Sequence, residues 1–139
     1  MSPDCIFCKI VAGQLPCVKV FENDHVLSFL DIYPAAEGHA LVVLKRHAPT
    51  IADATDKEIQ AAVVACREIG QAVMKATHSP GFNILQSNDR VAGQVIFHVH
   101  FHVIPRKAND GLNFVHNRFK PEPDQLKAAC ERIKANLMK

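Results

Sequence analysis

Long apolar runs, blocks of basic residues and internal repeats are all missing from this sequence of 139 residues. No apolar stretch approaches the roughly 20 residues that a membrane-spanning helix needs, and the first residues lack the basic and apolar segments of a secretory signal. The formal net charge is only +2 and the basic residues are dispersed, so no part of the chain is suited to track a nucleic-acid backbone. We therefore expect a cytoplasmic protein that binds neither membranes nor nucleic acids.

The size and composition of the chain suit one globular unit. Hydrophobic residues make up 48% of the sequence and charged residues 22%, which is enough for one buried core beneath an ordinary solvated surface. Domains usually contain about 100–200 residues. We therefore expect residues 1–139 to form a single domain.

Short segments bounded by turn residues predict a mostly antiparallel sheet. The segments that we expect to be strands are residues 18–22, 25–30, 40–44, 82–86 and 95–104, the last of them ending at Pro105. The run over 40–44 is continuously apolar, which is typical of a strand that is covered on both faces.

Capping and periodicity signals predict two main helices, and so an α+β fold. Thr55 and Glu58 have the spacing of a capping box, and apolar residues follow at steps of three and four, including Val63. The apolar face of this helix is core or a subunit interface. A last amphipathic helix starts near Pro123, and residues 5–12 form a short helical turn.

The sequence contains five cysteines, which is an odd number. Two of them, Cys5 and Cys8, are separated by two residues. In a reducing compartment such a pair is better explained by metal or redox chemistry than by a structural disulfide. One pair supplies only half of a tetrahedral metal site, so two further ligands are needed.

Three histidines, His98, His100 and His102, alternate with apolar residues. Residues two apart on a strand project from the same face, so we expect three imidazoles on one side of the strand and an apolar surface on the other. Lining up three imidazoles costs solvation and packing free energy unless something uses them. Two interpretations are open: a nucleophilic imidazole with helpers, or three ligands of a catalytic metal.

The run His98-Val99-His100-Phe101-His102-Val103-Ile104 resembles the signature of the histidine triad (HIT) family. The resemblance extends through Gly93-Gln94, Gly38-His39, residues 29–32 and the segment from Cys5 to Ile10. It covers about residues 4–106 and leaves the role of the region after residue 106 open. It implies a five-stranded antiparallel sheet with two main helices, and pairing of two copies into a homodimer.

The resemblance also implies an activity and its catalytic residues. His100 would attack the α-phosphorus of a purine nucleotide, a dinucleoside polyphosphate or a nucleoside phosphoramidate, and form a covalent nucleotidyl-histidine without a catalytic cofactor. The backbone carbonyl of His98 would hold the other ring nitrogen of His100. His102 would face the α-phosphate, and His39 would support the triad from the neighbouring strand.

A nucleotide pocket built from three kinds of side chain is implied as well. An acid would grip the ribose hydroxyls, amides would contact the phosphate, and apolar residues would sandwich the purine base. The corresponding positions are Asp31 for the ribose, Asn88 and Gln94 for the phosphate, and Ile6, Phe7, Phe29 and Ile32 for the base.

Cysteine-bearing relatives in the family hold a structural zinc ion. The corresponding residues here are Cys5, Cys8, His47 and His98. Zinc at these residues would stabilise the backbone beside His100 rather than act as a Lewis acid. Free thiols are the alternative.

One position departs from the family pattern. Val95 stands where many phosphoramidate-cleaving relatives have a serine that protonates the leaving group, and a valine cannot donate a proton. Valine at this position therefore disfavours an amine leaving group. Arg106, Lys107 and Arg118 could instead meet distal phosphates of a polyphosphate chain.

Two alternatives to a metal-free hydrolase or nucleotidyl transferase remain at this stage. The three histidines could form a catalytic zinc centre, although no acidic general base stands beside them. The chain could also be a non-catalytic sensor that binds purine nucleotides. The sequence leaves the leaving group, the base preference and the biological pathway open.

Overall fold

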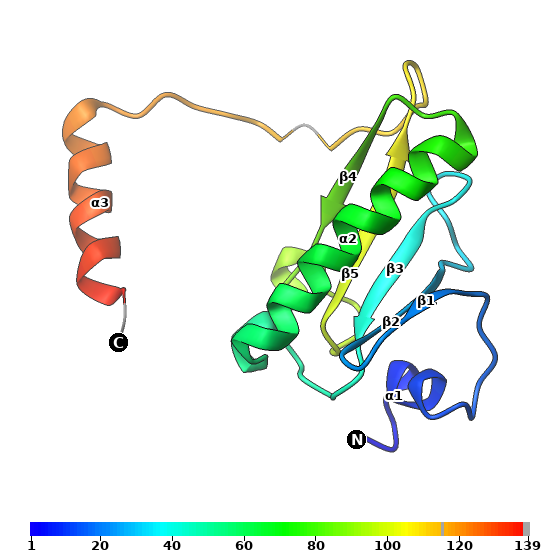
Figure 1. Ribbon diagram of the computed structural model, residues 1–139. Coiled ribbons are helices and arrows are strands. Elements are labelled where there is room, and N and C mark those ends of the chain that lie inside the picture. Colours follow the sequence, from blue (N-terminus) through cyan, green and yellow to red (C-terminus); the bar gives the residue numbers. More distant parts are fainter. Residues whose placement is uncertain (115, 138–139) are drawn as a thin grey trace.

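The computed structural model describes residues 1–114 and 116–137, and its centre is a five-stranded antiparallel sheet in the order β1-β2-β3-β5-β4 (Figure 1). The strands are β1 (Lys19–Glu22), β2 (Val26–Leu30), β3 (Ala40–Leu44), β4 (Gly81–Leu85) and β5 (His100–Arg106). The helices are α1 (Ile6–Val11), α2 (Asp56–Thr77) and α3 (Pro123–Asn136), with short 3-10 turns at Ile51–Asp53 and Arg90–Ala92. The expected α+β architecture is confirmed.

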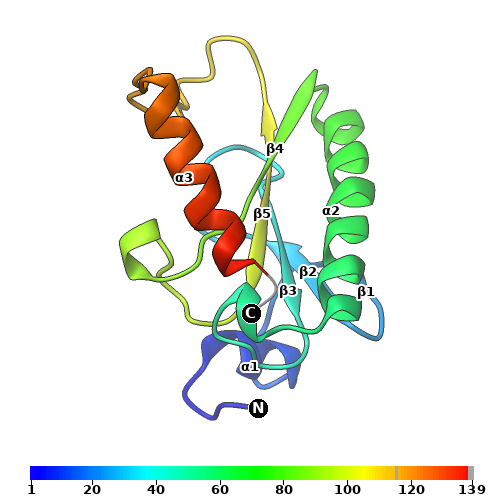
Figure 2. The ribbon, with the colours of Figure 1, turned by 90° about the vertical axis from the view of Figure 1, so that its left-hand side faces the viewer.

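Helix α2 begins where the capping box predicts. The Thr55 hydroxyl accepts a hydrogen bond from the Glu58 N–H at 3.3 Å, and the Glu58 carboxylate accepts one from the Thr55 N–H at 2.8 Å. The helix lies along one face of the sheet (Figure 2) and buries Ala62, Cys66 and Ile69 among other residues. Val63, which we placed on the apolar face, is 49% exposed, because it lies about 100° around the helix from Ala62.

The opposite face of the sheet is covered at one end by α1 (Figure 2). Phe7 of α1 packs there against Phe29 of β2, with ring centroids 5.8 Å apart, and Leu41 and Val43 of β3 belong to the same cluster. All five residues of β3 are buried, as its continuous apolar run predicts. This second face carries the candidate functional site.

The predicted strand over residues 95–104 is wrong at both ends. Strand β5 starts only at His100, because Val99 has already turned to donate its N–H to the carbonyl of Ala48 at 2.8 Å. It then continues through Pro105 to Arg106. A proline is tolerated there because the pairing with β3 ends at Val103, which leaves β5 paired only with β4.

Helix α3 stands apart from the sheet at the end of an extended segment (Figure 1). It begins at Pro123, as predicted, but its apolar residues Leu126 and Ile133, and Leu137 directly after its end, are each more than half exposed. Among the helices of the described residues, none has the length and apolar character needed to cross a membrane.

Candidate active site

A cavity of about 500 Å³ opens on the sheet face opposite α2. Its apolar walls come from α1, β2, β3 and the loops that flank them: Ile6, Phe7, Ile10, Leu15, Pro16, Phe29, Leu30, Ile32, Leu41, Val95 and Ile96. Cys17, Asp31, Tyr33, Gly93, His100 and His102 complete the lining. The structure thus brings all four predicted base-contacting residues to one apolar cavity of the size that small ligands occupy.

His100, the first residue of β5, is held in one orientation. Its Nδ1 donates a hydrogen bond to the backbone carbonyl of His98 at 2.7 Å, and its ring makes a T-shaped contact with the Phe7 ring at a centroid distance of 5.0 Å. With the proton on Nδ1, the Nε2 atom carries a free lone pair. The sequence implied this carbonyl contact, and the structure contains it.

A chain of hydrogen bonds fixes His102, two residues further along the strand. The backbone N–H of Ala35 donates to His39 Nδ1 at 3.0 Å, so the neutral His39 ring carries its proton on Nε2. His39 Nε2 then donates to His102 Nδ1 at 2.9 Å. His102 must therefore carry its own proton on Nε2, which makes that atom a hydrogen-bond donor.

Burial keeps these imidazoles uncharged. It lowers the pKa of His39 and of His100, and the carboxylate of Asp31 only partly offsets the effect on His39. For His102, burial and the neighbouring His100 and His39 rings lower the pKa to about 4. At neutral pH the array consists of neutral rings with defined donors and acceptors.

Asp31 lies directly after β2, at the edge of the cavity. One carboxylate oxygen accepts a hydrogen bond from the Tyr33 N–H at 2.9 Å, and the other lies 3.6 Å from His39 Nε2. Its side chain is 18% exposed. Tyr33, which the sequence analysis missed, lines the same wall, and no periodic pattern marked it.

Asn88 and Gln94 do not line the cavity. The Gln94 carboxamide accepts from the Asp89 N–H and donates to the carbonyls of Pro49 and Ile96, so it holds its own loop together. The Asn88 side chain pairs with Gln86 and accepts from the Ile51 N–H at 2.8 Å. The structure does not place these amides at the cavity, because the Gln86 side chain and backbone groups of two segments already occupy their hydrogen-bonding atoms.

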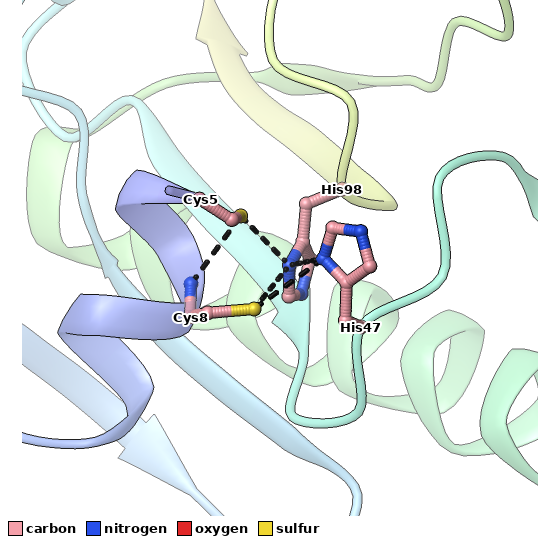
Figure 3. A group of neighbouring side chains, drawn as sticks. All are labelled: Cys5, Cys8, His47 and His98. Atoms are coloured by element: carbon pink, nitrogen blue, oxygen red, sulfur yellow. Dashed lines mark hydrogen bonds between the residues drawn. The ribbon is translucent and has the colours of Figure 1, made fainter. Parts of the chain in front are cut away.

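The four predicted metal ligands, in contrast, come together in one cluster (Figure 3). His98 Nδ1 lies 3.3 Å from Cys5 Sγ, 3.5 Å from Cys8 Sγ and 3.3 Å from His47 Nδ1. Cys8 Sγ also lies 3.3 Å from His47 Nδ1. Two sulfurs and two ring nitrogens thus surround one point between α1, the loop after β3 and the segment before β5.

His98 belongs to this cluster and not to the row of imidazoles in the cavity. Its ring is fully buried, and Nε2 donates to the Leu44 carbonyl at 2.5 Å, which leaves the Nδ1 lone pair directed at the sulfurs. The three imidazoles lie on one side of the chain as expected, since the Phe7 ring packs against both His98 and His100 and the His100 ring packs against His102, while Val99, Phe101 and Val103 lie in the core beneath α2. His98, however, precedes β5, and its ring nitrogen faces the sulfurs. The three rings do not converge as the ligands of one catalytic metal would.

Asp31, His39 and His102 also lie within metal-binding distance of one another. Their hydrogen bonds do not suit a metal, since the Ala35 N–H occupies one His39 nitrogen and the proton sits on the other. The arrangement is that of a proton-sharing chain.

Comparison with known proteins gives a consistent result. The family model described as HIT domain matches residues 12–109. The chain is 45% identical over 112 residues to the Adenylylsulfatase HINT3 of Arabidopsis thaliana, covering 81% of this chain and 57% of that protein. It is 40% identical over 137 residues to the Adenosine 5'-monophosphoramidase hnt1 of Schizosaccharomyces pombe, covering 96% and 98%.

Solved structures share the fold. A member of the HIT family from Bacillus subtilis superposes with a TM-score of 0.91 at 37% identity, covering 98% of this chain and 99% of that one. A zinc-bound histidine triad family protein from Mycobacterium smegmatis gives a TM-score of 0.76 at 31% identity, covering 95% and 96%. That residues 1–139 form a single domain stays a prediction.

Proposed function

The chain belongs to the HIT domain family and is a hydrolase that acts on nucleotides, and from that premise we propose that His100 attacks the α-phosphorus and forms a covalent nucleotidyl-histidine. The observation that carries the proposal is the hydrogen bond from His100 Nδ1 to the His98 carbonyl. This bond leaves Nε2 as the reactive nitrogen at the wall of the cavity.

The first step transfers the nucleotidyl group to the ring. The Nε2 lone pair of His100 bonds to phosphorus, and the bond to the leaving group breaks with its electron pair going to that group. The His98 carbonyl, which accepts the Nδ1–H, stabilises the positive charge that appears on the imidazole. In the second step water attacks phosphorus, the electron pair of the P–N bond returns to Nε2, and the water proton passes to solvent.

His102 and His39 prepare the site for charge on the phosphoryl oxygens. His102 Nε2–H is a donor because His39 holds the opposite nitrogen as an acceptor. A donor that is fixed before the reaction needs little reorganisation as charge develops. We assign His102 to the phosphate and His39 to the orientation of His102.

The nucleoside would fill the apolar part of the cavity. Phe7 and Phe29 give a buried aromatic wall, whereas Ile6 and Ile32 line the cavity while 45% and 79% exposed. Asp31 would offer its carboxylate to the ribose hydroxyls. For Asn88 and Gln94 we propose a role in shaping the loop after β4, with phosphate contact only if that loop rearranges.

Trapping of the intermediate tests this mechanism. The protein is mixed with adenosine 5'-phosphosulfate, adenosine 5'-phosphoramidate or diadenosine tetraphosphate, quenched within one turnover, and digested for mass spectrometry. We expect an adenylyl group on the peptide that contains His100, and none in His100→Asn, which keeps nucleotide binding. Turnover retained by His100→Asn would refute the mechanism, and tight binding without turnover of any substrate by the wild type would favour a nucleotide sensor.

We propose zinc as the occupant of the Cys5, Cys8, His47 and His98 cluster. A tetrahedral site with zinc–sulfur bonds of about 2.3 Å and zinc–nitrogen bonds of about 2.0 to 2.1 Å has ligand separations of about 3.3 to 3.8 Å. The separations of 3.3 to 3.5 Å in the cluster fit that geometry. A set of four protein ligands leaves no position for substrate, so the ion would tie α1 to the segment that carries the His98 carbonyl.

We also propose that two copies of the chain pair. Strand β4 is an edge of the sheet, and its Ile84 and Leu85 are 46% and 42% exposed. Light scattering after size exclusion should give twice the chain mass of 15.4 kDa. Ile84→Lys should shift the protein toward the monomer mass, since a lysine on an edge strand disfavours pairing. A monomer mass for the wild type at micromolar concentration would contradict the proposal.

A further inference from the structure

Two of the four residues in the metal cluster are also placed to bond to each other (Figure 3). Cys5 directly precedes α1 and Cys8 lies in its first turn, and the Cys8 N–H donates to Cys5 Sγ at 3.4 Å. The two sulfurs lie within 4.8 Å of each other. Residues three apart at the start of a helix have Cα atoms about 5 Å apart, and a disulfide needs about 4.4 to 6.8 Å. The backbone of α1 therefore holds this pair at a spacing that a disulfide can bridge.

The pair can be reached by a small molecule from solvent. Cys5 is partly exposed, whereas Cys8 is 2% exposed and lies behind it. The backbone N–H of Ser2 covers part of Cys8, at 3.5 Å from Sγ. A small oxidant would therefore meet the Cys5 sulfur first and find the second sulfur next to it.

The other three cysteines lie on separate elements. Cys17 lies in the loop before β1, Cys66 is buried on α2, and Cys130 is exposed on α3. Burial raises the pKa of the Cys66 thiol to about 12, so this thiol is unreactive. These residues provide internal references for the reactivity of single thiols.

We propose that Cys5 and Cys8 are a modification site, at which hydrogen peroxide forms a disulfide and releases the bound metal. The Cys5 thiolate attacks one oxygen of the peroxide, the O–O bond breaks, and hydroxide leaves. The Cys8 thiolate then attacks the sulfur of the resulting sulfenic acid, the S–O bond breaks, and a second hydroxide leaves. The two sulfurs give two electrons to the peroxide, and two protons from solvent convert both hydroxides to water. A thiolate binds zinc and a disulfide does not, so the ion leaves the cluster.

The two residues between the cysteines connect this chemistry to the nucleotide cavity. Ile6 and Phe7 both line the cavity, and the Phe7 ring contacts the His100 ring. A disulfide would enclose Ile6 and Phe7 in one covalent ring and would separate His98 from its sulfur neighbours. Oxidation should therefore also weaken nucleotide binding. This second part rests on the proposed function.

Zinc release and peptide mass test the modification site in the full chain. The zinc-loaded protein carries Cys130→Ser, which removes an exposed thiol that could join two copies, and is treated with one equivalent of hydrogen peroxide. A chromophoric chelator measures the released zinc, and alkylation before tryptic digestion marks the free thiols. The peptide 1–9 ends at Lys9 and contains no cysteine besides the pair. We expect one zinc ion released per chain and this peptide unalkylated and lighter by two hydrogen atoms, with reversal by dithiothreitol and added zinc.

The same measurements define the contrary results. Alkylated Cys5 and Cys8 after treatment, with Cys17 oxidised, would overturn the proposal, as would a sulfinic acid on peptide 1–9 in place of the disulfide. Cys66→Ser is the matched control and should give the same disulfide and the same zinc release. Absence of zinc before oxidation would overturn the metal release together with the zinc site, while the mass of peptide 1–9 would still test the disulfide.

Binding of adenosine monophosphate tests the connection to the cavity. Calorimetry compares the reduced zinc form with the oxidised form. We expect Kd to rise about tenfold on oxidation, through loss of aromatic contact with Phe7, and to return after reduction with zinc. An unchanged Kd with the disulfide in place would overturn the connection. If the reduced form did not bind the nucleotide, the proposed function would fail, whereas the zinc and mass results would decide the modification site independently.

Discussion

Two groups of histidines adjoin at His98, and the ring nitrogens make different hydrogen bonds in each group. In the cluster beside α1, His98 Nε2 donates a hydrogen bond to the Leu44 carbonyl, and His98 Nδ1 faces the sulfurs of Cys5 and Cys8. In the cavity, His39 Nδ1 accepts a hydrogen bond from the Ala35 N–H, and His39 Nε2 donates one to His102. The backbone group on one ring nitrogen thus sets whether the other nitrogen presents a lone pair, as in His98, or a proton, as in His39.

The two groups are joined by the backbone of His98. Its side chain lies in the cysteine cluster, while its carbonyl orients His100 in the cavity. A disturbance of the first group should therefore reach the second through this peptide, and a disturbance of the second should leave the first intact.

The largest effect is expected from Cys8→Ser. Cys8 is 2% exposed, and its loss removes one of four ligands from a buried cluster. We expect bound zinc to be lost, the free energy of unfolding to fall by about 3 kcal/mol or more, and kcat to fall as the His98 carbonyl shifts. Metal analysis, urea denaturation and single-turnover kinetics measure these effects.

Cys66→Ser is the control for the cysteine change. Cys66 is equally buried, but it lies on α2 in the other core cluster. This variant should be destabilised through packing while it keeps its metal. Full zinc content in Cys8→Ser would show that the cluster is not a metal site.

His39→Ala tests the other half of the comparison. Without the His39 ring, His102 loses the bond that fixes its tautomer, so we expect kcat to fall by about 10- to 100-fold, or about 1.4 to 2.7 kcal/mol. Zinc content should match the wild type. His39→Gln, whose amide can donate near the Nε2 position, should recover part of kcat; equal loss in both variants would indicate that only the ring volume matters.

The sequence predicted the scaffold well where local signals act alone. The capping box at Thr55 placed the start of α2, and the apolar run over 40–44 placed the buried strand β3. The predicted start of the strand was wrong around His98, because the turn at Val99 depends on the carbonyl of Ala48, about 50 residues away in the sequence. A period-two pattern cannot reveal a partner that distant.

The candidate site was predictable in its residue types more than in their orientation. The four ligands of the cluster and the apolar cavity walls followed from the family resemblance. The orientation of the Gln94 side chain did not, since it results from hydrogen bonds to backbone groups of Asp89 and Ile96 in its own loop and of Pro49 in the segment after β3. Side-chain direction in loops depends on such bonds, which leave no periodic trace in a sequence.

Asp31→Asn distinguishes a ribose contact from a metal ligand in the cavity. Removing the charge should raise KM about tenfold, since a hydrogen bond to a carboxylate is worth more than one to a neutral amide. Cobalt titration provides the second measurement, because a site with cysteine ligands gives a sulfur-to-cobalt charge-transfer band. We expect one cobalt per chain with that band in both proteins. A second, sulfur-free site that disappears in Asp31→Asn would show that the cavity group also binds metal.

The smallest effect on stability is expected from Glu58→Gln, which lies beside the loop that carries His47 of the cysteine cluster. The Arg46 guanidinium donates to both Glu58 oxygens, at 2.6 and 2.8 Å, and to the Asp53 carbonyl, which steadies the loop that presents His47. This contact holds the pKa of Glu58 at about 2, below its ordinary value. The ion pair therefore adds stability above about pH 4.5 and loses it as the pH falls toward 2.

Because the Arg46 side chain is 51% exposed, solvent screens the pair and we expect a loss of less than about 1 kcal/mol at pH 7. Urea denaturation at pH 7 and at pH 2.5 measures it. The difference in the free energy of unfolding between wild type and Glu58→Gln should be smaller at pH 2.5, where the wild-type carboxylate begins to take up a proton. An equal difference in the free energy of unfolding at both pH values would mean that the variant acts through the geometry of the capping box and not through the charge. The loop that carries His47 would then be held by contacts other than the ion pair.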